Sequence, residues 1–451
     1  MITLTKEQEK VVDFKGQQML VKGIAGSGKT LVLLKHAEKT AIENPNAKIG
    51  IFSYGKTLTQ AASTQVNHKN ISVQTFHKWA AKVYKNIYGI PSYCNSTDEK
   101  KFFEKALHKI SKSYNNHRFF KNEGLKEFIR DEITWIKGCG FELKEDYLNA
   151  SRKGRGTKIR LSQLDRTILF DIYFEYENNK FDKLDYDDSA RAIAKRLDSI
   201  PDYLKFDYIY IDEAQDLSKM ALCCLVSAGK KGCYIGADIG QKIYTTSFTW
   251  KEVGLDLRGN RVRTLNQSFR STKEIVELAQ SLQRNDEITQ DEEFTEHIIP
   301  KRSGKKPDLV YTNNVQTQDD IIRKIVTQLT TNYKDKTIGI LCRNYDSINR
   351  ISKLVYGEVL GKNNTSPTTK GVKLTTYYTS KGLEFDFVII PDILNPSSEA
   401  LLGEEFDWNK ERRLLYVAMT RAKLHLQLFT TDLNAKLITE LTPELYNLKK
   451  I

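Results

Sequence analysis

Short apolar runs recur along the chain, separated by longer segments in which apolar positions return at helical spacing. The clearest runs span residues 49–52, 208–211, 338–341 and 387–390. Runs of this length between helical segments are typical of buried parallel strands, because helices cover both faces of such a sheet. The pattern therefore predicts an α/β protein built from parallel sheets.

The pattern changes between residues 81 and 200, where Lys, Glu, Phe and Tyr recur at helical spacing and strand-like runs are few. This stretch predicts a helical insertion. The flanking stretches 1–80 and 201–264 then form one α/β domain in two segments. Residues 265–451 form a second α/β domain, with only a short insertion near 361–370.

The stretch that most strongly indicates a chemistry is Gly-Ile-Ala-Gly-Ser-Gly-Lys-Thr at residues 23–30. It follows the apolar run 18–21 and precedes the helical run 31–34, which is the strand, loop and helix order of a phosphate-binding P-loop. Its backbone N–H groups can face a polyphosphate, Lys29 can reach the β- and γ-phosphates, and Thr30 can bind Mg²⁺. A chance glycine-rich turn is disfavoured because the strand and the helix are both present. The candidate loop residues are Gly23, Ala25, Gly26, Ser27, Gly28, Lys29 and Thr30.

A second candidate site follows the run 208–211, where Asp212 and Glu213 are adjacent. Carboxylates at the end of a buried strand can meet a metal ion held by a P-loop. Asp212 is therefore expected to bind Mg²⁺ together with Thr30, and Glu213 to polarise the attacking water. An acidic turn after a strand is a common alternative for such a pair, but the P-loop upstream favours the catalytic interpretation.

Charge and composition narrow the choice of partner. The 451 residues carry a formal net charge of +13, which favours a polyanionic partner. The six cysteines show no metal-ligand spacing, which predicts thiols in a reducing compartment. The sequence has no signal-peptide pattern and no apolar run long enough to cross a membrane, so we expect a cytoplasmic protein with no membrane partner.

The stretch Asp-Glu-Ala-Gln-Asp at 212–216, taken with the P-loop, resembles superfamily 1 helicases of the UvrD/Rep type. Further stretches are similar to motifs of that family and follow in the family's order, among them 4–8, 236–244, 266–270, 380–385 and 411–422. The resemblance implies two RecA-like P-loop NTPase domains, parallel sheets flanked by helices, with ATP and Mg²⁺ bound between them. The helical insertion in the first domain would be similar to the family's 1B domain.

For the nucleotide, the resemblance implies contacts from both domains. Gln8 would read the adenine edge, Phe269 would stack on the adenine, and Glu384 would contact the ribose. Arg270 and Arg421 would reach the γ-phosphate from the second domain, stabilise charge in the transition state and close the cleft around ATP. With Gln241 as the γ-phosphate sensor, the implied catalytic set is Lys29, Asp212, Glu213, Gln241, Arg270 and Arg421.

The same resemblance implies contacts with DNA at Tyr54, Thr75, Phe76, His77, Tyr244, Trp250, Tyr378 and Lys381. Aromatic faces can stack on any base, although Tyr54 and Phe76 read alone would more often be core aromatics. The family's stacking tryptophan has no equivalent by position, which leaves Phe248 or Trp250 as the substitute, and Tyr378 stands where the family has histidine. The basic run 151–158 could hold phosphates or be a solvated loop.

The expected function is an ATP-dependent single-stranded DNA translocase or helicase, with the 3′→5′ polarity of the family, acting on single-stranded or tailed duplex DNA. Relatives carry a large accessory domain between the positions of Arg270 and Lys381, whereas this interval is short here. Movement along a strand is therefore the safer expectation than duplex unwinding. The alternative is an ATP-binding, DNA-sensing or scaffolding subunit that works with a partner nuclease or regulatory protein, as in a phage-defence system.

Overall fold

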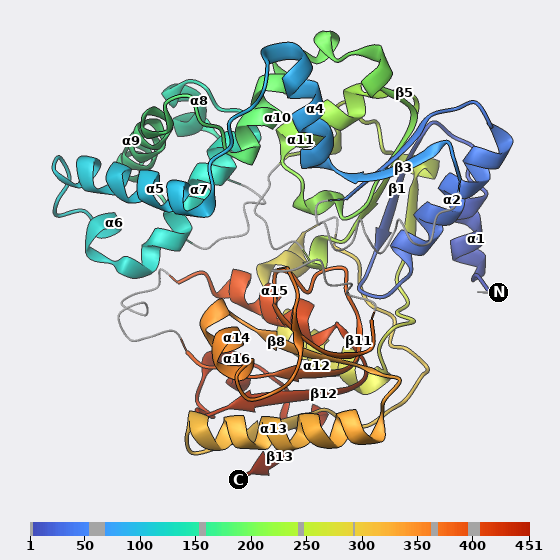
Figure 1. The fold of residues 1–451 in the computed structure, drawn as a ribbon, viewed down its shortest axis with the longest axis vertical. Coiled ribbons are helices and arrows are strands. Elements are labelled where there is room, and N and C mark those ends of the chain that lie inside the picture. The colour runs from blue at the N-terminus through green and yellow to red at the C-terminus, as the bar shows by residue number, and fades with distance from the viewer. Residues whose placement is uncertain are drawn as a thin grey trace.

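The structure is a computed structural model that describes residues 3–53, 68–152, 159–241, 248–291, 294–361, 369–395 and 406–451. Two α/β cores lie one above the other, with a group of helices beside the upper core (Figure 1). The upper core contains the N-terminus and the lower core contains the C-terminus. The molecule therefore has a first core, a helical insertion and a second core.

The first core is a six-stranded parallel sheet in the order β3-β2-β4-β5-β1-β6. Its alternating side chains serve two hydrophobic layers, because Met19 and Val21 pack on one face while Leu20 packs on the other. The strands are β1 (Gln18–Gly23), β2 (Ile49–Ser53), β3 (Ile71–Thr75), β4 (Phe206–Ile211), β5 (Gly229–Ala237) and β6 (Val262–Leu265). The helices that cover them are α1 (Lys6–Val12), α2 (Lys29–Glu43), α4 (Phe76–Tyr88), α10 (Tyr186–Ala194) and α11 (Lys219–Ser227).

The helical insertion has a hydrophobic core of its own, built from buried side chains between Phe103 and Tyr176. Its helices are α5 (Ser96–Ser111), α6 (Arg118–Lys121), α7 (Lys126–Cys139), α8 (Lys144–Asn149) and α9 (Gln163–Lys180). Helices α4 and α10 lie within or across the expected limits 81–200, yet Val83 and Ile193 belong to the core of the first sheet. The insertion that packs independently is therefore smaller than the helical stretch of the sequence.

The second core is a seven-stranded parallel sheet in the order β13-β7-β12-β11-β8-β10-β9. The strands are β7 (Asp308–Tyr311), β8 (Thr337–Cys342), β9 (Glu358–Val359), β10 (Gly371–Thr376), β11 (Phe385–Ile390), β12 (Ala422–Thr430) and β13 (Asn447–Lys450). The helices are α12 (Lys273–Gln283), α13 (Val315–Asn332), α14 (Tyr345–Ile351), α15 (Trp408–Met419) and α16 (Lys436–Thr439). Apolar side chains cover both faces of this sheet.

The predicted fold class is confirmed: the chain forms two parallel sheets flanked by helices. The four apolar runs singled out in the sequence lie within β2, β4, β8 and β11. The elements described between Arg270 and Lys381 belong mostly to the second core, and most of the predicted insertion near 361–370 lies outside the described residues. Within the described ranges, none of the helices combines the length and the apolar character needed to span a membrane.

Candidate active site

The P-loop lies between β1 and α2, and its backbone allows a ligand to approach closely. Gly26 and Gly28 have φ values of 73° and 86°, a region that L side chains rarely adopt. A Cβ at Gly23 would lie 2.6 Å from Ser27 Oγ, so a larger residue would crowd the loop. Ser27 Oγ is buried and has no hydrogen-bond partner in the part of the chain that the structure describes. The glycine backbone and this hydroxyl fit the phosphates of a nucleotide.

Lys29, the first residue of α2, extends its side chain back along the loop. Its Nζ donates to the carbonyl oxygens of Gly23 at 2.8 Å and Ile24 at 3.0 Å, and it lies 3.4 Å from Asp238 Oδ2. The side chain is only 6% exposed. Its oxygen partners are acceptors of the kind that phosphate oxygens provide, so the ammonium is placed to exchange them for a polyphosphate.

Asp212 directly follows β4 and meets the start of α2. Thr30 Oγ1 donates to Asp212 Oδ2 at 2.6 Å, which brings a hydroxyl and a carboxylate oxygen together. Oxygen ligands of this kind suit Mg²⁺, so the pair fits the predicted metal site. Burial and the neighbouring Glu213 carboxylate raise the pKa of Asp212 to about 6. A divalent cation would favour the charged carboxylate.

Glu213 adopts a left-handed backbone conformation with φ 53°, which is uncommon for a residue other than glycine. Burial alone would raise the pKa of its carboxyl, but the ammonium groups of Lys381 and Lys29 hold that pKa below its ordinary value. Gln215 donates from Nε2 to Glu213 Oε2. Glu213 is therefore a buried, charged and oriented carboxylate, as a general base requires.

A continuous chain of polar contacts runs from the P-loop to the second core. Asp238, at the end of β5, pairs with Lys29 and accepts a hydrogen bond from Gln241 Nε2. Gln241 Oε1 in turn accepts from Arg421 Nη2 at 2.6 Å. Burial and the nearby Arg270 lower the pKa of Arg421 to about 9. Asp238 had no role in the sequence analysis, although it lies inside the stretch 236–244; its burial and its partners depend on tertiary contacts.

Arg270 lies directly against the P-loop although it follows β6. A Cβ added to Gly26 would lie 2.6 Å from Arg270 Cβ, and Phe269 N donates to Gly26 O at 2.9 Å. The Arg270 guanidinium donates to Glu384 Oε2 at 3.1 Å and to the Thr420 carbonyl at 3.3 Å. The two predicted arginines therefore reach the same cleft as Lys29, one over the loop and one through Gln241.

Three nucleotide contacts stay predictions, and their residues lie at the cleft. Phe269 exposes about half of its side chain, 49%, beside the P-loop. Gln8 is buried; its Oε1 accepts from Thr5 N at 3.0 Å and its Nε2 donates to Ser27 O at 3.1 Å, so it braces the loop. The Glu384 carboxylate pairs with Arg270 and Lys423.

Lys381 lies in the cleft between the two cores, where the sequence analysis predicted a DNA contact. Its Nζ donates to Asp216 Oδ1 at 2.8 Å and to the Gln241 carbonyl at 2.6 Å, and it lies 3.9 Å from Glu213 Oε2. The DNA contact of Lys381 stays a prediction; in this structure three oxygens of the first core surround its ammonium group. Asp216 is the second residue that sequence reasoning missed, since its partner comes from a distant segment.

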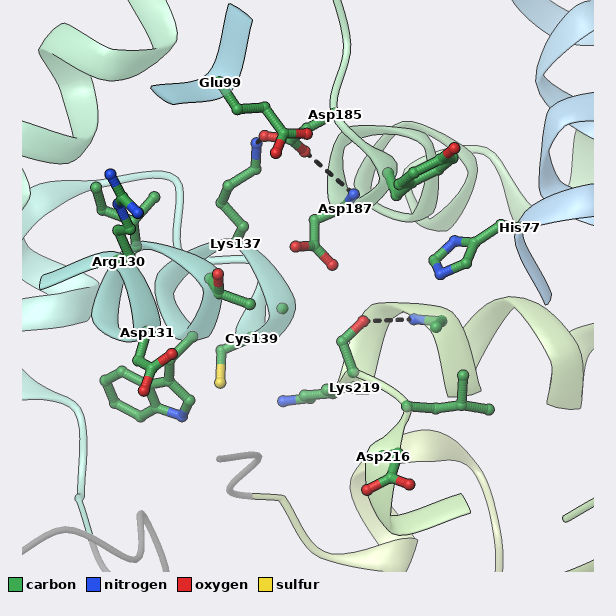
Figure 2. Close-up of a pocket in the computed structure, with 18 of the residues that line it drawn as sticks. His77, Glu99, Arg130, Asp131, Lys137, Cys139, Asp185, Asp187, Asp216 and Lys219 are labelled. Atoms are coloured by element: carbon green, nitrogen blue, oxygen red, sulfur yellow. Dashed lines mark hydrogen bonds and ion pairs between the residues drawn. The ribbon is translucent and has the colours of Figure 1, made fainter. Parts of the chain in front are cut away.

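A pocket of about 530 Å³ lies where the three parts of the molecule meet (Figure 2). The first core contributes His77, Asp216, Lys219 and Phe248, the insertion contributes Arg130, Asp131, Lys137 and Cys139, and the second core contributes Tyr378 and Lys410. Aromatic rings and cations occur together here, as a single-stranded nucleic acid requires. The carboxylates of Asp131, Asp185 and Asp187 line the same pocket.

The predicted DNA contacts divide into several groups. His77 and Tyr378 line the pocket; burial lowers the pKa of His77 to about 4, so its ring is neutral. Thr75 caps α4 by accepting from Lys78 N, and Trp250 packs on Phe248 at a ring separation of 5.7 Å. Tyr54 and Tyr244 lie outside the described residues, as does most of the run 151–158.

Phe76 requires a correction. Its side chain is 1% exposed and packs with Trp79 in the core of the first sheet. A base could not stack on this ring without opening the core. The side chain of this first residue of α4 therefore packs into the core of the first sheet, although Phe76 also lines the pocket.

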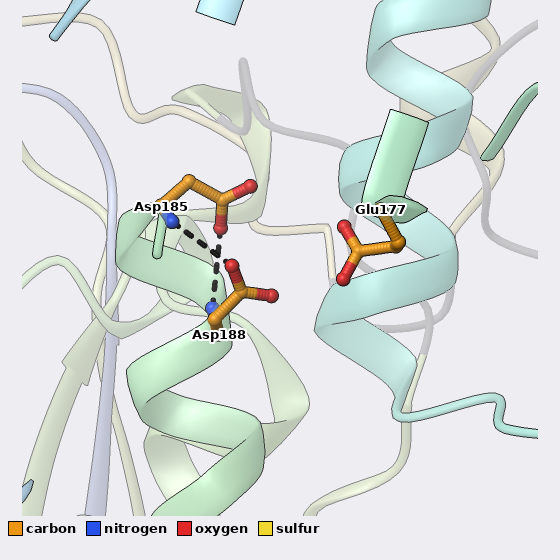
Figure 3. A group of neighbouring side chains, drawn as sticks. All are labelled: Glu177, Asp185 and Asp188. Atoms are coloured by element: carbon orange, nitrogen blue, oxygen red, sulfur yellow. Dashed lines mark hydrogen bonds between the residues drawn. The ribbon is translucent and has the colours of Figure 1, made fainter. Parts of the chain in front are cut away.

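Three carboxylates lie close together at the junction of the insertion and the first core, from Glu177, Asp185 and Asp188 (Figure 3). Lys137 Nζ lies 3.0 Å from Glu177 and 2.6 Å from Asp188, and it also pairs with Asp185. Lys180 contacts the same three carboxylates. Because the two ammonium groups and the Arg191 guanidinium, which lies 3.7 Å from Glu177, balance the three carboxylates, the cluster is an ion-pair junction rather than a cation site.

The two parallel-sheet cores share one cleft at the P-loop. The first core contributes the acidic groups, and two arginines from segments after β6 contact the same cleft. This arrangement defines a two-lobed P-loop NTPase. The chain belongs to the UvrD/Rep helicase family. The family model described as the UvrD/REP helicase N-terminal domain matches residues 4–248, and the model described as the UvrD-like helicase C-terminal domain matches residues 359–432.

Individual relatives are distant and longer. The chain is 25% identical over 353 residues to the "Probable DNA helicase II homolog" of Mycoplasma capricolum, covering 71% of this chain and 46% of that protein. It is 24% identical over 343 residues to "ATP-dependent DNA helicase PcrA" of Bacillus subtilis, covering 68% and 41%. The matched region is thus less than half the length of these relatives. A solved structure, the C-terminal domain of a possible DNA helicase from Lactobacillus strain WCFS1, matches 40% of this chain and 98% of that chain, at 22% identity and a TM-score of 0.30.

Proposed function

We propose that the protein is an ATP-dependent single-stranded DNA translocase or helicase, which hydrolyses ATP with Mg²⁺ between its two cores and moves 3′→5′ along the strand. The observation that carries the proposal is the chain of contacts from Lys29 through Asp238 and Gln241 to Arg421. Because these contacts connect the P-loop with the second core, a nucleotide bound at the loop would affect both cores. The proposed polarity rests on the family resemblance.

Each residue of the cleft has a role that follows from its contacts. Lys29 is proposed to exchange its carbonyl partners for phosphate oxygens, and Glu213 to accept a proton from the attacking water. Bound by Thr30 and Asp212, Mg²⁺ would supply electrostatic stabilisation of the phosphate charge. Arg270 and Arg421 would then donate to the charge that develops on the phosphate oxygens.

Coupling to DNA is proposed to run through the shared boundary of cleft and pocket. Asp216 lines the pocket and also binds Lys381, which lies near Glu213. A change in the distance between the cores would therefore alter the pocket and the catalytic carboxylate together. Alternating grip on the strand follows if ATP closes the cleft and hydrolysis opens it.

The decisive measurement is steady-state ATP hydrolysis with and without single-stranded DNA. We expect strong stimulation by DNA in the wild type. Glu213→Gln should lower turnover by roughly 10²–10⁴-fold, because it removes the base but keeps the side chain's shape, while fluorescent ATP still binds. Glu38→Gln alters an ion pair with Lys35 on the surface of α2 and should leave turnover unchanged. Turnover that ignores DNA would contradict the proposal.

Direction and unwinding need a second assay. Strand displacement from duplexes with a 3′ tail, a 5′ tail or blunt ends separates the possibilities, and the 3′-tailed duplex is expected to be the substrate. If the protein removes a label bound to a single strand but does not displace the strand of a duplex, its activity is limited to translocation. Preference for the 5′ tail would overturn the proposed polarity.

The scaffolding alternative has less support. A subunit that only senses DNA does not need a charged base, a metal-ligand pair and two arginines in one cleft, and the proximity of the candidate residues for these roles supports hydrolysis instead. A nuclease or regulatory partner would have to be sought by co-purification.

A further inference from the structure

The pocket is bounded by three ion-pair junctions, one between each pair of neighbouring parts. Lys137 joins the insertion to the first core, and Lys381 joins the second core to Asp216 of the first. The third junction joins the second core to the insertion through Lys410. Lys137, Asp216 and Lys410 each line the pocket as well. At the pocket, an ion pair therefore joins each pair of neighbouring parts of the molecule.

The third junction consists of Lys410, Glu127 and Asp131, and we name it the clasp. Lys410 Nζ donates to Glu127 Oε1 at 2.9 Å and to Asp131 Oδ2 at 2.6 Å. Burial alone would lower the pKa of Lys410, but Asp131, Tyr378 and Glu127 more than offset that effect, so its ammonium stays charged. The lysine is 8% exposed, whereas the two carboxylates are 57% and 32% exposed.

Neighbouring groups reinforce the clasp from the second core. Arg343 makes a two-pronged ion pair with Glu411 at 2.6 and 2.8 Å, and it lies 3.7 Å from Glu127. The Tyr378 ring lies under both cations, 5.8 Å from the Arg343 guanidinium and 5.9 Å from Lys410 Nζ. The clasp is thus a connected network of charges. Salt would screen a lone ion pair on the surface more strongly than this network.

We propose that the clasp closes the pocket into a channel, so that the substrate class of this protein is a single nucleic-acid strand with a free end that can be threaded. This rests on the proposed function, because it assumes that the pocket holds the strand. At the junctions of Lys381 and Lys137 the partner carboxylates are mostly buried, whereas both carboxylates of the clasp are partly exposed to solvent. The clasp is the junction that a strand without an end would have to break.

The opposite charges within the clasp predict different effects of its variants on DNA binding. Glu127 and Asp131 repel phosphates, while Lys410 attracts them. Removing the two carboxylates should therefore tighten binding of DNA, whereas removing the lysine should weaken it. Both changes open the clasp, so both should abolish any preference for linear over circular strands. An effect of charge alone cannot move both variants in the same direction.

The test uses the full chain and one labelled oligo-dT strand, prepared linear and ligated into a covalent circle of the same length. Stopped-flow fluorescence gives the association rate constant for each. We expect the wild type to bind the circle more slowly, on the order of tenfold, because binding then requires opening. The ratio should approach one in Lys410→Gln and in the double variant Glu127→Gln with Asp131→Asn. The charge exchange Lys410→Glu with Asp131→Lys should restore the preference.

Lys144→Gln is the matched control, because Lys144 pairs with Asp171 at 2.7 Å inside the insertion, away from the second core. It should keep the wild-type ratio. Equal rates for circle and linear strand in the wild type overturn the clasp proposal without any variant, so the conclusion does not depend on how the variants fold. Failure of the wild type to bind either strand would instead overturn the proposed function.

Discussion

At the scale of single residues, Asp238 is the link between the P-loop lysine and Gln241. It is 5% exposed and touches Lys29 on one side and Gln241 on the other. Asp238→Asn keeps the size but removes the charge that holds both partners. We expect DNA-stimulated ATP turnover to fall roughly tenfold, as the loss of a charged hydrogen bond implies, with the affinity for ATP changed less.

Steady-state kinetics with and without DNA check this prediction. Asp13→Asn is the control, because Asp13 pairs with Lys39 on an exposed surface and should leave both parameters unchanged. Equal losses in basal and DNA-stimulated turnover would show that Asp238 acts only on the P-loop.

At this scale, the sequence could predict a residue's role where the residues that define it lie close together along the chain. The P-loop was predictable because strand, glycines and Lys29 are contiguous, and Thr30 with Asp212 because each directly follows a recognisable pattern. Asp238 and Asp216 acquire their roles from partners far along the chain. Phe76 was misjudged because the pattern fixes its place after β3 but not the direction of its side chain.

At the scale of elements, the close contact between the P-loop and the segment after β6 requires a glycine at position 26. Gly26→Ala combines an unfavourable φ of 73° with a Cβ 2.6 Å from Arg270 Cβ. We expect ATP turnover to fall at least roughly tenfold, because the displaced segment carries both Phe269 and Arg270, and bonds of a guanidinium to charge are worth about 1.5–3 kcal/mol.

Gly259→Ala provides the matched comparison. Gly259 also has a positive φ, 56°, but an added Cβ would meet nothing within 4 Å. It should cost only the backbone strain, about 1–2 kcal/mol of the free energy of unfolding, and leave turnover unchanged. Thermal unfolding and ATP hydrolysis measured on both variants separate strain from displacement. Similar turnover in the two variants would contradict the role given to this contact.

The elements themselves were largely predictable, because buried parallel strands have to be apolar on both faces. The runs at 49–52 and 387–390 extend by only one or two residues in β2 and β11. Helices α4 and α10 were harder to assign. Their amphipathic patterns do not say which core they cover, and the first sheet rather than the insertion buries them.

At the scale of the whole molecule, the net charge of +13 should dominate the affinity for DNA. Raising the salt concentration from 50 to 200 mM is expected to weaken binding of oligo-dT by on the order of tenfold or more, because bound phosphates release counterions. Fluorescence anisotropy across this range gives the slope of log affinity against log salt. Lys219→Gln, in the pocket, should reduce the slope by roughly one.

Lys230→Gln is the corresponding control, since Lys230 pairs with Asp202 away from the pocket. An unchanged slope in Lys219→Gln together with a reduced slope in Lys230→Gln would place the bound strand elsewhere on the surface. Affinity that does not respond to salt would mean that the positive charge serves another purpose.

The division of labour between the two lobes has a practical consequence. Lys29, Asp212 and Glu213 come from the N-terminal part of the chain, whereas Arg421 comes from the C-terminal part. Expressed as separate polypeptides, neither fragment would hold all the residues of the proposed hydrolytic centre. Reassembly of the two fragments could then be followed directly as recovered phosphate release, which makes this fold a starting point for a split reporter of molecular proximity.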